Sequence, residues 1–364
     1  MKLWVGMGTV ALGLVAAAGC ESSEEGTGGS GGTGGSGTGG SGGTGGSSGT
    51  GGSSTSSGTG GGTSFSCSNP ASAWLLCEDF EAGGGDFDTW FAGSEFNAAD
   101  GEDDRGRVDL SSEHVHGGGY SLHMPAAASS SYEGASLGWR KCLGDVQESP
   151  CDVMDSYEQL YFRVWVRFDE DHERVHHFLN IAGSQPDRFY SLGSSGCQRT
   201  GEHSIAATVD VEPDTHDTFF YTYYPGMDCS PNCVDYMGQA WLDQNCQHCA
   251  DIGMPTCDGP AGQQCCWGDE FYPPTPSPLP VGNWFCFEMR LRANTPNVSD
   301  GVMAYWVDGA LVHEVDDMMW RTVPELALNR VGLQHYNTSS DADGHSNQVW
   351  FDDVVVSTEP VGCD

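Results

Sequence analysis

Apolar and polar residues alternate along several short segments of the chain, which is the pattern of β-strands that bury one face in a core. The segment 160–168, LYFRVWVRF, shows it clearly, because every second residue from Leu160 to Phe168 is apolar. The segment 301–312, GVMAYWVDGALV, has the shape of a hairpin with Asp308 and Gly309 at its turn. Further strand-like runs lie at 217–227, 283–293, 329–337 and 348–357.

Long helical patterns are missing, and Gly, Asp and Ser turns separate these runs. The sequence therefore predicts an all-β fold, a two-sheet antiparallel β-sandwich (jelly roll) with a cysteine-rich loop insertion.

The first twenty residues indicate export. Lys2, an apolar stretch and the small residues before Cys20 form a signal peptide with a bacterial lipoprotein box, although Ala17 stands where leucine is commoner. The mature chain would begin at a lipid-modified Cys20 that anchors it to a membrane surface without spanning it. We therefore expect an exported protein, lipid-anchored at the cell envelope or the cell surface. An ordinary cleaved signal peptide is the alternative.

Composition divides the rest of the chain. Residues 21–63 are almost wholly Gly, Ser and Thr after a short acidic patch, so they are expected to form a flexible tether. Residues 64–364 are long enough for one jelly-roll domain with a sizeable core, in which 228–277 form the cysteine-rich insertion.

The charge balance limits the kinds of partner that the protein can bind. The chain has 14 Lys and Arg against 51 Asp and Glu, a net charge of −37, which argues against nucleic acid. An acidic ligand would bind only where basic residues gather locally.

We expect the protein to be a monomer.

The chain has fifteen cysteines, and setting Cys20 aside leaves an even number, so up to about seven disulfides are expected in an exported protein. The segment 246–249, CQHC, has the spacing of a zinc knuckle with His248 inside it. An oxidising compartment favours disulfides there. Sequence does not determine the pairing. Cys142 and Cys151 are close enough in the sequence to form a local disulfide, and a disulfide between Cys67 and Cys363 could join the two ends of the domain.

Several motifs together resemble a known superfamily. They are CEDFE at 77–81, YFRVWVRF at 161–168 followed by HHFLNIAGS at 176–184, DGVMAYWVDGALV at 300–312 and VWFDDVVVS at 349–357. This set resembles the concanavalin A-like lectin/glucanase jelly rolls, and within them the polysaccharide-lyase-like proteins: the fungal cellulose-induced-protein group, and more distantly glucuronan and alginate lyases. The resemblance covers roughly Cys77 to Cys363 apart from the insertion. These lyases often have a lysine-glycine segment where this chain has HHFLNIAG.

The resemblance implies a curved sheet whose concave face is open to solvent and binds an extended glycan. That would explain two arginines and two aromatics on the polar face of 161–167. Aromatic rings suit sugar faces, and arginine binds carboxylates in a bidentate way. Ion pairs with neighbouring acids such as Glu158, Asp169 or Glu288 are the alternative. The residues expected on one shared face, binding an acidic polysaccharide, are Tyr161, Arg163, Trp165, Arg167, Tyr221, Tyr223, Arg290, Arg292, Gln334 and Tyr336.

A uronic-acid lyase needs a group that neutralises the carboxylate, a base for the proton at C5, and an acid for the leaving oxygen at C4. Strict alternation puts His176 and His177 on opposite faces, so at most one of them is expected to reach the substrate. A structural role for either histidine is the alternative. The candidates are Arg163, Asn180 and Gln334 as neutralisers, His176 or His177 as base, and Tyr223 as acid.

The resemblance also implies a structural Ca²⁺ site where the first and last strands meet, because related jelly rolls often bind the ion there and Ca²⁺ prefers carboxylate and backbone oxygens. By motif its ligands are Glu78 and Asp352, with Asp79, Asp353, Asp341 and Asp343 as alternatives.

The prediction is a surface-anchored protein that engages a uronic-acid polysaccharide and cleaves it by β-elimination. A carbohydrate-binding or adhesive lipoprotein without turnover is the first alternative, and a structural disulfide-rich coat protein is another. Glucanase activity is not expected, because no strand carries the Glu-x-Asp-x-x-Glu arrangement of the glucanases in this superfamily, and 168–174, FDEDHER, reads as a charged turn.

Overall fold

The computed structural model describes residues 65, 67–81, 109–126, 133–140, 156–173, 175–185, 197–213, 215–227, 229–230, 249, 265–337 and 347–363. The signal peptide, Cys20, the tether and most of the cysteine-rich insertion lie outside these ranges, as do Asp341 and Asp343. No helix within the described ranges is long and apolar enough to cross a membrane.

The named elements of the described residues are all strands, and most of them belong to two antiparallel sheets, as predicted. The eight-stranded sheet has the order β14 (Ala310–Met318), β13 (Gly301–Val307), β12 (Trp284–Arg292), β5 (Gln159–Phe168), β16 (Asn347–Ser357), β3 (Ser121–Ala126) and β2 (Asp109–Ser111), with β1 (Trp74–Glu78) paired to β16. The six-stranded sheet has the order β11 (Asp269–Phe271), β8 (Thr218–Tyr223), β7 (Ser204–Val211), β6 (Val175–Ser184), β15 (Arg330–Asn337) and β4 (Glu133–Arg140). A small ribbon pairs β9 (Cys229–Ser230) with β10 (Cys265–Cys266).

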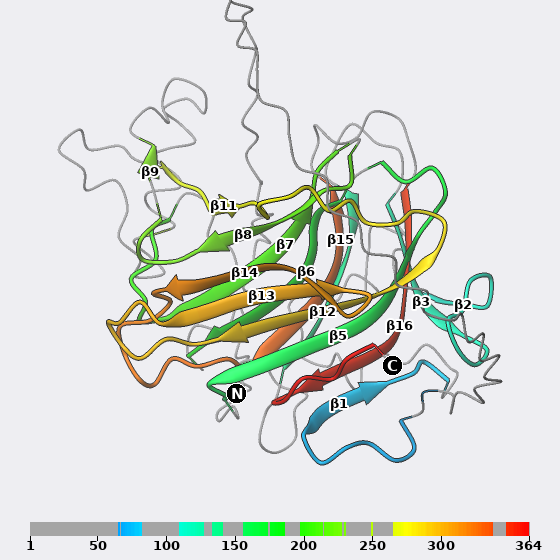
Figure 1. Cartoon of the computed structure of the whole chain (residues 1–364), viewed down its shortest axis with the longest axis horizontal. Coiled ribbons are helices and arrows are strands. Elements are labelled where there is room, and N and C mark those ends of the chain that lie inside the picture. Colours follow the sequence, from blue (N-terminus) through cyan, green and yellow to red (C-terminus); the bar gives the residue numbers. More distant parts are fainter. Residues whose placement is uncertain are drawn as a thin grey trace, which may run out of the picture. The chain divides into compact units, whose positions relative to one another are not determined.

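The two sheets pack face to face around one core. In Figure 1, β5, β12, β13 and β14 run side by side in one layer, and β6, β7 and β8 in the other. The alternation along β5 is confirmed, since its apolar residues from Leu160 to Phe168 are fully buried. Phe178 on β6 meets Phe287 on β12 edge to face, with ring centroids 5.7 Å apart. Each such side chain stabilises the fold by about 1.5–3 kcal/mol through apolar burial.

The predicted hairpin joins β13 to β14. Asp308 and Gly309 both have positive φ angles, 48° and 77°, which is the backbone of a tight turn between twisted strands. Oδ1 of Asp308 also accepts the backbone N–H of Cys286 at 2.9 Å, which fastens the turn to β12.

The predicted clasp between Cys67 and Cys363 is wrong. Cys67 pairs with Cys77 across a short loop, and Cys363 pairs with Cys286 on β12. The carboxylate of Glu288 accepts the N–H groups of Val361 and Gly362, so the chain end lies along β12.

In the insertion, Cys249 forms a disulfide with Cys197, so the expectation of disulfides over zinc is confirmed for this cysteine. Its neighbours in CQHC lie outside the described residues, as do Cys142 and Cys151.

Candidate functional site: the outer face of the six-stranded sheet

Six of the polar candidates of the sequence gather on the outer face of the six-stranded sheet, the face directed away from the other sheet. On β7 the odd-numbered residues Ile205, Ala207 and Val209 belong to the core, so Thr208 and Asp210 point to the outer face. Registered neighbours from adjacent strands extend this face. One row runs Gly332, Asn180, Thr208 and Tyr221, and the next runs Arg330, Ala182, Ala206 and Tyr223.

The start of β6 breaks the strand alternation, and this corrects the expectation that only one histidine reaches the face. Val175 pairs with Val211 and Leu179 with Val209, so the three residues 176–178 of β6 lie opposite one residue of β7, Asp210. The extra residues form a bulge, which re-aims the side chains within it. His176 and His177 therefore lie beside each other, with ring centroids 4.2 Å apart.

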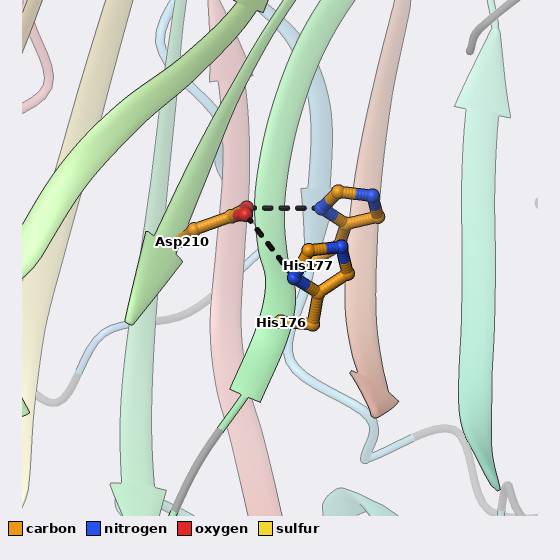
Figure 2. Close-up of side chains that lie close together, drawn as sticks. All are labelled: His176, His177 and Asp210. Carbon is orange, nitrogen blue, oxygen red and sulfur yellow. Dashed lines mark hydrogen bonds and ion pairs between the residues drawn. The ribbon is translucent and has the colours of Figure 1, made fainter. Parts of the chain in front are cut away.

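Both histidines face the same carboxylate. Nδ1 of His177 lies 3.0 Å from Oδ1 of Asp210, and Nδ1 of His176 lies 3.6 Å from Oδ2 (Figure 2). The Asp210 side chain is 2% exposed, whereas those of His176 and His177 are 23% and 26% exposed. The buried carboxylate thus holds the rings from below and leaves part of each one open to solvent. With its proton on Nδ1, facing Asp210, a neutral His177 has Nε2 as its unprotonated nitrogen, and that is the atom that would act as a base.

Two tyrosines on β8 form a second polar group. The hydroxyls of Tyr221 and Tyr223 lie 3.2 Å apart, and the N–H of Gly268 donates to the Tyr221 hydroxyl at 3.1 Å. The guanidinium carbon of Arg199 lies 5.5 Å from the centre of the Tyr223 ring. The His177 and Tyr221 ring centroids are 5.7 Å apart, so the tyrosine pair adjoins the histidines.

Burial raises the pKa of both phenols. For Tyr221 the pKa lies well above its usual value, because burial and the neighbouring Tyr223 both disfavour the phenolate. For Tyr223 burial also raises the pKa, but the hydrogen bond from Tyr221 and the charge of Arg199 act in the opposite direction. Tyr223 is therefore the member of the pair whose anion the surroundings support better.

A pair of amides completes the face. Nδ2 of Asn180 donates to Oε1 of Gln334 at 2.8 Å, and both side chains are buried. Within the described part of the chain, the buried Oδ1 of Asn180 accepts no hydrogen bond. Tyr336 pairs with His177 through the strand backbone, and its side chain lies outside the described set. The structure thus brings His176, His177, Asn180, Tyr221, Tyr223 and Gln334 to one face of one sheet.

The predicted single shared face is wrong for the other six residues. β5 and β12 belong to the eight-stranded sheet, so their polar residues point away from the outer face described above. The two-residue repeat of a strand predicts which of its residues share a face, but it does not predict which sheet the strand joins. The residues affected are Tyr161, Arg163, Trp165, Arg167, Arg290 and Arg292.

These side chains already have partners in the protein. Arg163 is 3% exposed, its Nη1 donates to the Asp353 carbonyl at 2.8 Å, and its guanidinium lies 4.4 Å from the centre of the Phe65 ring. Trp165 stacks on His116 with centroids 3.7 Å apart.

The remaining arginines of this sheet bind protein oxygens. Arg167 donates to the Gly282 carbonyl, Arg292 to the Asp300 carbonyl, and Arg290 to the Gln159 side chain, while Tyr161 is buried beside Arg290. Most of these contacts are with backbone carbonyls and ring faces, whereas Arg290 also pairs with an acid, Glu314, at 3.9 Å, as the alternative expected.

The candidate calcium ligands lie where the first and last described strands meet, because β1 pairs with β16 and Glu78 stands opposite Val354. In this structure their oxygens accept backbone N–H groups: Glu78 Oε1 from Phe80, and Asp352 Oδ2 from His116. Burial and the charge of Asp353 raise the pKa of Asp352 to about 7.

Two residues of the site were missed from the sequence. Asp210 is the only charged residue in 204–211, SIAATVDV, and an acid inside an apolar strand was the available signal. Arg199 lies in the segment before β7, and no local pattern marks it.

A scan against protein-family models finds no match, and a search of curated proteins finds none either. Among solved structures, alginate lyase vAL-1 from Chlorella virus is similar, with 12% identity, TM-score 0.47, and coverage of 69% of this chain and 90% of that one. Endo-β-1,4-glucuronan lyase from the fungus Trichoderma reesei has 14% identity, TM-score 0.43, and coverage of 79% and 96%. Cellulose induced protein Cip1 has 16% identity, TM-score 0.42, and coverage of 79% and 100%. These neighbours are of the kinds that the strand motifs resemble, and at this level of similarity the function has to be argued from the side chains of this chain.

Proposed function

We propose that the chain binds a uronic-acid polysaccharide on the outer face of the six-stranded sheet and cleaves it by β-elimination. The observation that carries the proposal is the convergence of a carboxylate-paired histidine, a hydrogen-bonded tyrosine pair and an amide pair on neighbouring strands. These are the base, the acid and the carboxylate contact that the reaction requires.

His177 is the proposed base. Its Nδ1 donates to Asp210, so its Nε2 takes the proton from C5 of the uronate. The electrons of the C5–H bond form the C4–C5 double bond, and the bond from C4 to the glycosidic oxygen breaks. The hydroxyl pair of Tyr221 and Tyr223 returns a proton to that oxygen. His177 is favoured over His176 because its nitrogen is closer to Asp210 and its ring is closer to Tyr221.

The amide pair is the proposed neutraliser. Removing the C5 proton places negative charge on the neighbouring carboxylate, and a hydrogen bond there stabilises the transition state. Nδ2 of Asn180 carries two N–H groups, so it can donate one to Gln334 and the other to a carboxylate. A neutral amide contact suits a site where Arg163 does not take part.

The test is a lyase assay with the full chain. Glucuronan, alginate, pectate and a neutral glucan are each offered, and the ultraviolet absorbance of the unsaturated uronate is followed, because only β-elimination creates it. Signal on a uronate polymer supports the proposal. Silence on every polymer, with one of them retained on an affinity gel, would instead make the chain a carbohydrate-binding protein without turnover.

We also propose that Cys20 carries a lipid anchor and that Ca²⁺ binds near Glu78 and Asp352. The signal-peptide pattern before Cys20 supports the lipid anchor. The pairing of β1 with β16 supports the Ca²⁺ site. Radiolabelled fatty-acid incorporation tests the anchor against a Cys20→Ser variant. Calcium titration with thermal unfolding tests the ion, and no change in melting temperature would contradict it.

A further inference from the structure

Nitrogen and oxygen ligand atoms converge at the bulge of β6. One atom from each of His176, His177 and Asp210 lies within 4.8 Å of the others (Figure 2). We propose that these three residues form a Zn²⁺ site, and that zinc at this site switches off the elimination chemistry. The second half of the proposal rests on the proposed function, whereas the first half stands without it.

The spacing of the ligand atoms fits the ion. Zn²⁺ lies about 2.0–2.2 Å from imidazole nitrogen and carboxylate oxygen, so two ligands of a tetrahedral ion lie roughly 3.4 Å apart. His177 Nδ1 lies 3.0 Å from Oδ1 of Asp210 and His176 Nδ1 lies 3.6 Å from Oδ2, so each nitrogen approaches one oxygen of the carboxylate at a distance close to that value. No two of the three ligand atoms are more than 4.8 Å apart.

The donor set selects the kind of metal. Two imidazole nitrogens and one carboxylate suit Zn²⁺ and its neighbours among the transition metals, whereas Ca²⁺ and Mg²⁺ prefer oxygen ligands. The buried Asp210 supplies the negative charge, and the partly exposed histidines put the site in contact with solvent, which can supply water as a further ligand.

The backbone gives an independent reason. A regular strand turns successive side chains to opposite faces, so two adjacent residues do not reach one carboxylate. The bulge between Val175 and Leu179 places both histidines on it. Orienting a single catalytic base requires only one histidine beside Asp210. A metal site, in contrast, requires both histidines.

Metal binding and base catalysis exclude each other at His177. A metal on Nδ1 leaves the proton of the neutral imidazole on Nε2, and a protonated Nε2 donates a hydrogen bond instead of accepting a proton. The zinc-loaded chain is therefore expected to lose the base that the metal-free chain has.

The binding test uses the full chain after treatment with a chelator and dialysis. Titration with Zn²⁺ is expected to load one high-affinity ion per chain, and Co²⁺ to give the absorption bands of a nitrogen–oxygen site. His176→Gln and Asp210→Asn should each weaken binding at least about 100-fold, because each loses a direct ligand. His123→Gln is the matched control, since His123 also pairs with a carboxylate, Asp109, at 2.9 Å, and no second histidine of the described residues pairs with Asp109.

If His176→Gln binds Zn²⁺ with wild-type affinity, the proposed site is wrong. An equal loss of Zn²⁺ affinity in His123→Gln would also contradict it. Circular dichroism checks the fold of each variant. If Asp210→Asn does not fold, the partly exposed His176 decides the question, because its replacement leaves no buried charge unpaired.

The activity test compares each protein with and without Zn²⁺. Wild type is expected to lose at least about 90% of its lyase rate with one ion bound and to recover it with chelator, since general-base catalysis contributes roughly 10²–10⁴-fold. Full activity with zinc bound would overturn the exclusion. Absence of turnover in metal-free protein would overturn the lyase proposal and with it the switch, while the binding titration would still decide the zinc site.

Discussion

The side-chain amides of Asn180 and Gln334, 154 residues apart in the chain, are joined by a hydrogen bond of 2.8 Å. The contact depends on Gly332, which stands opposite Asn180 in the sheet and has no side chain to occupy the space between β6 and β15. A Cβ atom at Gly332 would lie 2.4 Å from Nδ2 of Asn180, closer than real Cβ contacts come.

Gly332→Ala should therefore displace the Asn180 amide and break its bond to Gln334. We expect the lyase rate to fall about 10–100-fold, because a displacement of about 1 Å is costly in an oriented site. Steady-state kinetics measures this. Gly119→Ala is the control, since among the described residues its Cβ would meet Glu81 Oε2 alone, at an ordinary 3.6 Å. Unchanged kinetics in Gly332→Ala would contradict the role of the amide pair.

His177→Ala should lower kcat by about 10²–10⁴-fold, because it removes the proposed base while leaving the amide contact in place. The initial rate of unsaturated uronate formation reports the loss, and retention on a uronate gel should stay within a few-fold of wild type. His123→Ala in the other sheet should keep the wild-type rate. A full rate in His177→Ala would rule out the base assigned here.

Arg163→Ala should affect stability and not ligand binding. The change removes a buried donor from the Asp353 carbonyl and a cation from the Phe65 ring, so we expect the free energy of unfolding to fall by about 2 kcal/mol. Urea denaturation measures it. The exposed Arg292, replaced by Ala, should change it by less than about 0.5 kcal/mol. Selective loss of uronate binding in Arg163→Ala would restore the arginine to the ligand site.

His335 should make the fold sensitive to acid. Burial lowers its pKa from 6.5 to about 4, and its Nδ1 bonds the Met124 carbonyl. The unfolded chain takes up a proton below about pH 6.5, but the folded chain does so only near pH 4. Stability is therefore lost as the pH falls through this window, by about 3 kcal/mol from this group.

Urea denaturation of wild type and His335→Leu at pH 7.5 and pH 4.5 isolates this contribution, because the other titrating groups are common to both proteins. The variant should lose less stability between the two pH values than wild type does. An equal loss in both would show that His335 is not the group responsible.

The sequence by itself determined the strands and the fold class. Alternation along 160–168 follows from a backbone that turns successive side chains to opposite faces, and this local rule needs no knowledge of neighbours. The hairpin at Asp308 and Gly309 is local in the same way, because these residues accept the positive φ angles that the turn requires.

The tertiary structure alone decided which strands share a face. Arg163 lies on the polar face of β5, and Asn180 lies on the polar face of β6, the next strand along the chain. Because β5 and β6 belong to different sheets, these two residues point in opposite directions. The bulge that brings His176 and His177 to Asp210 likewise depends on pairing with β7, more than thirty residues further along. Long-range pairing and register set both features, and local alternation contains no information about either.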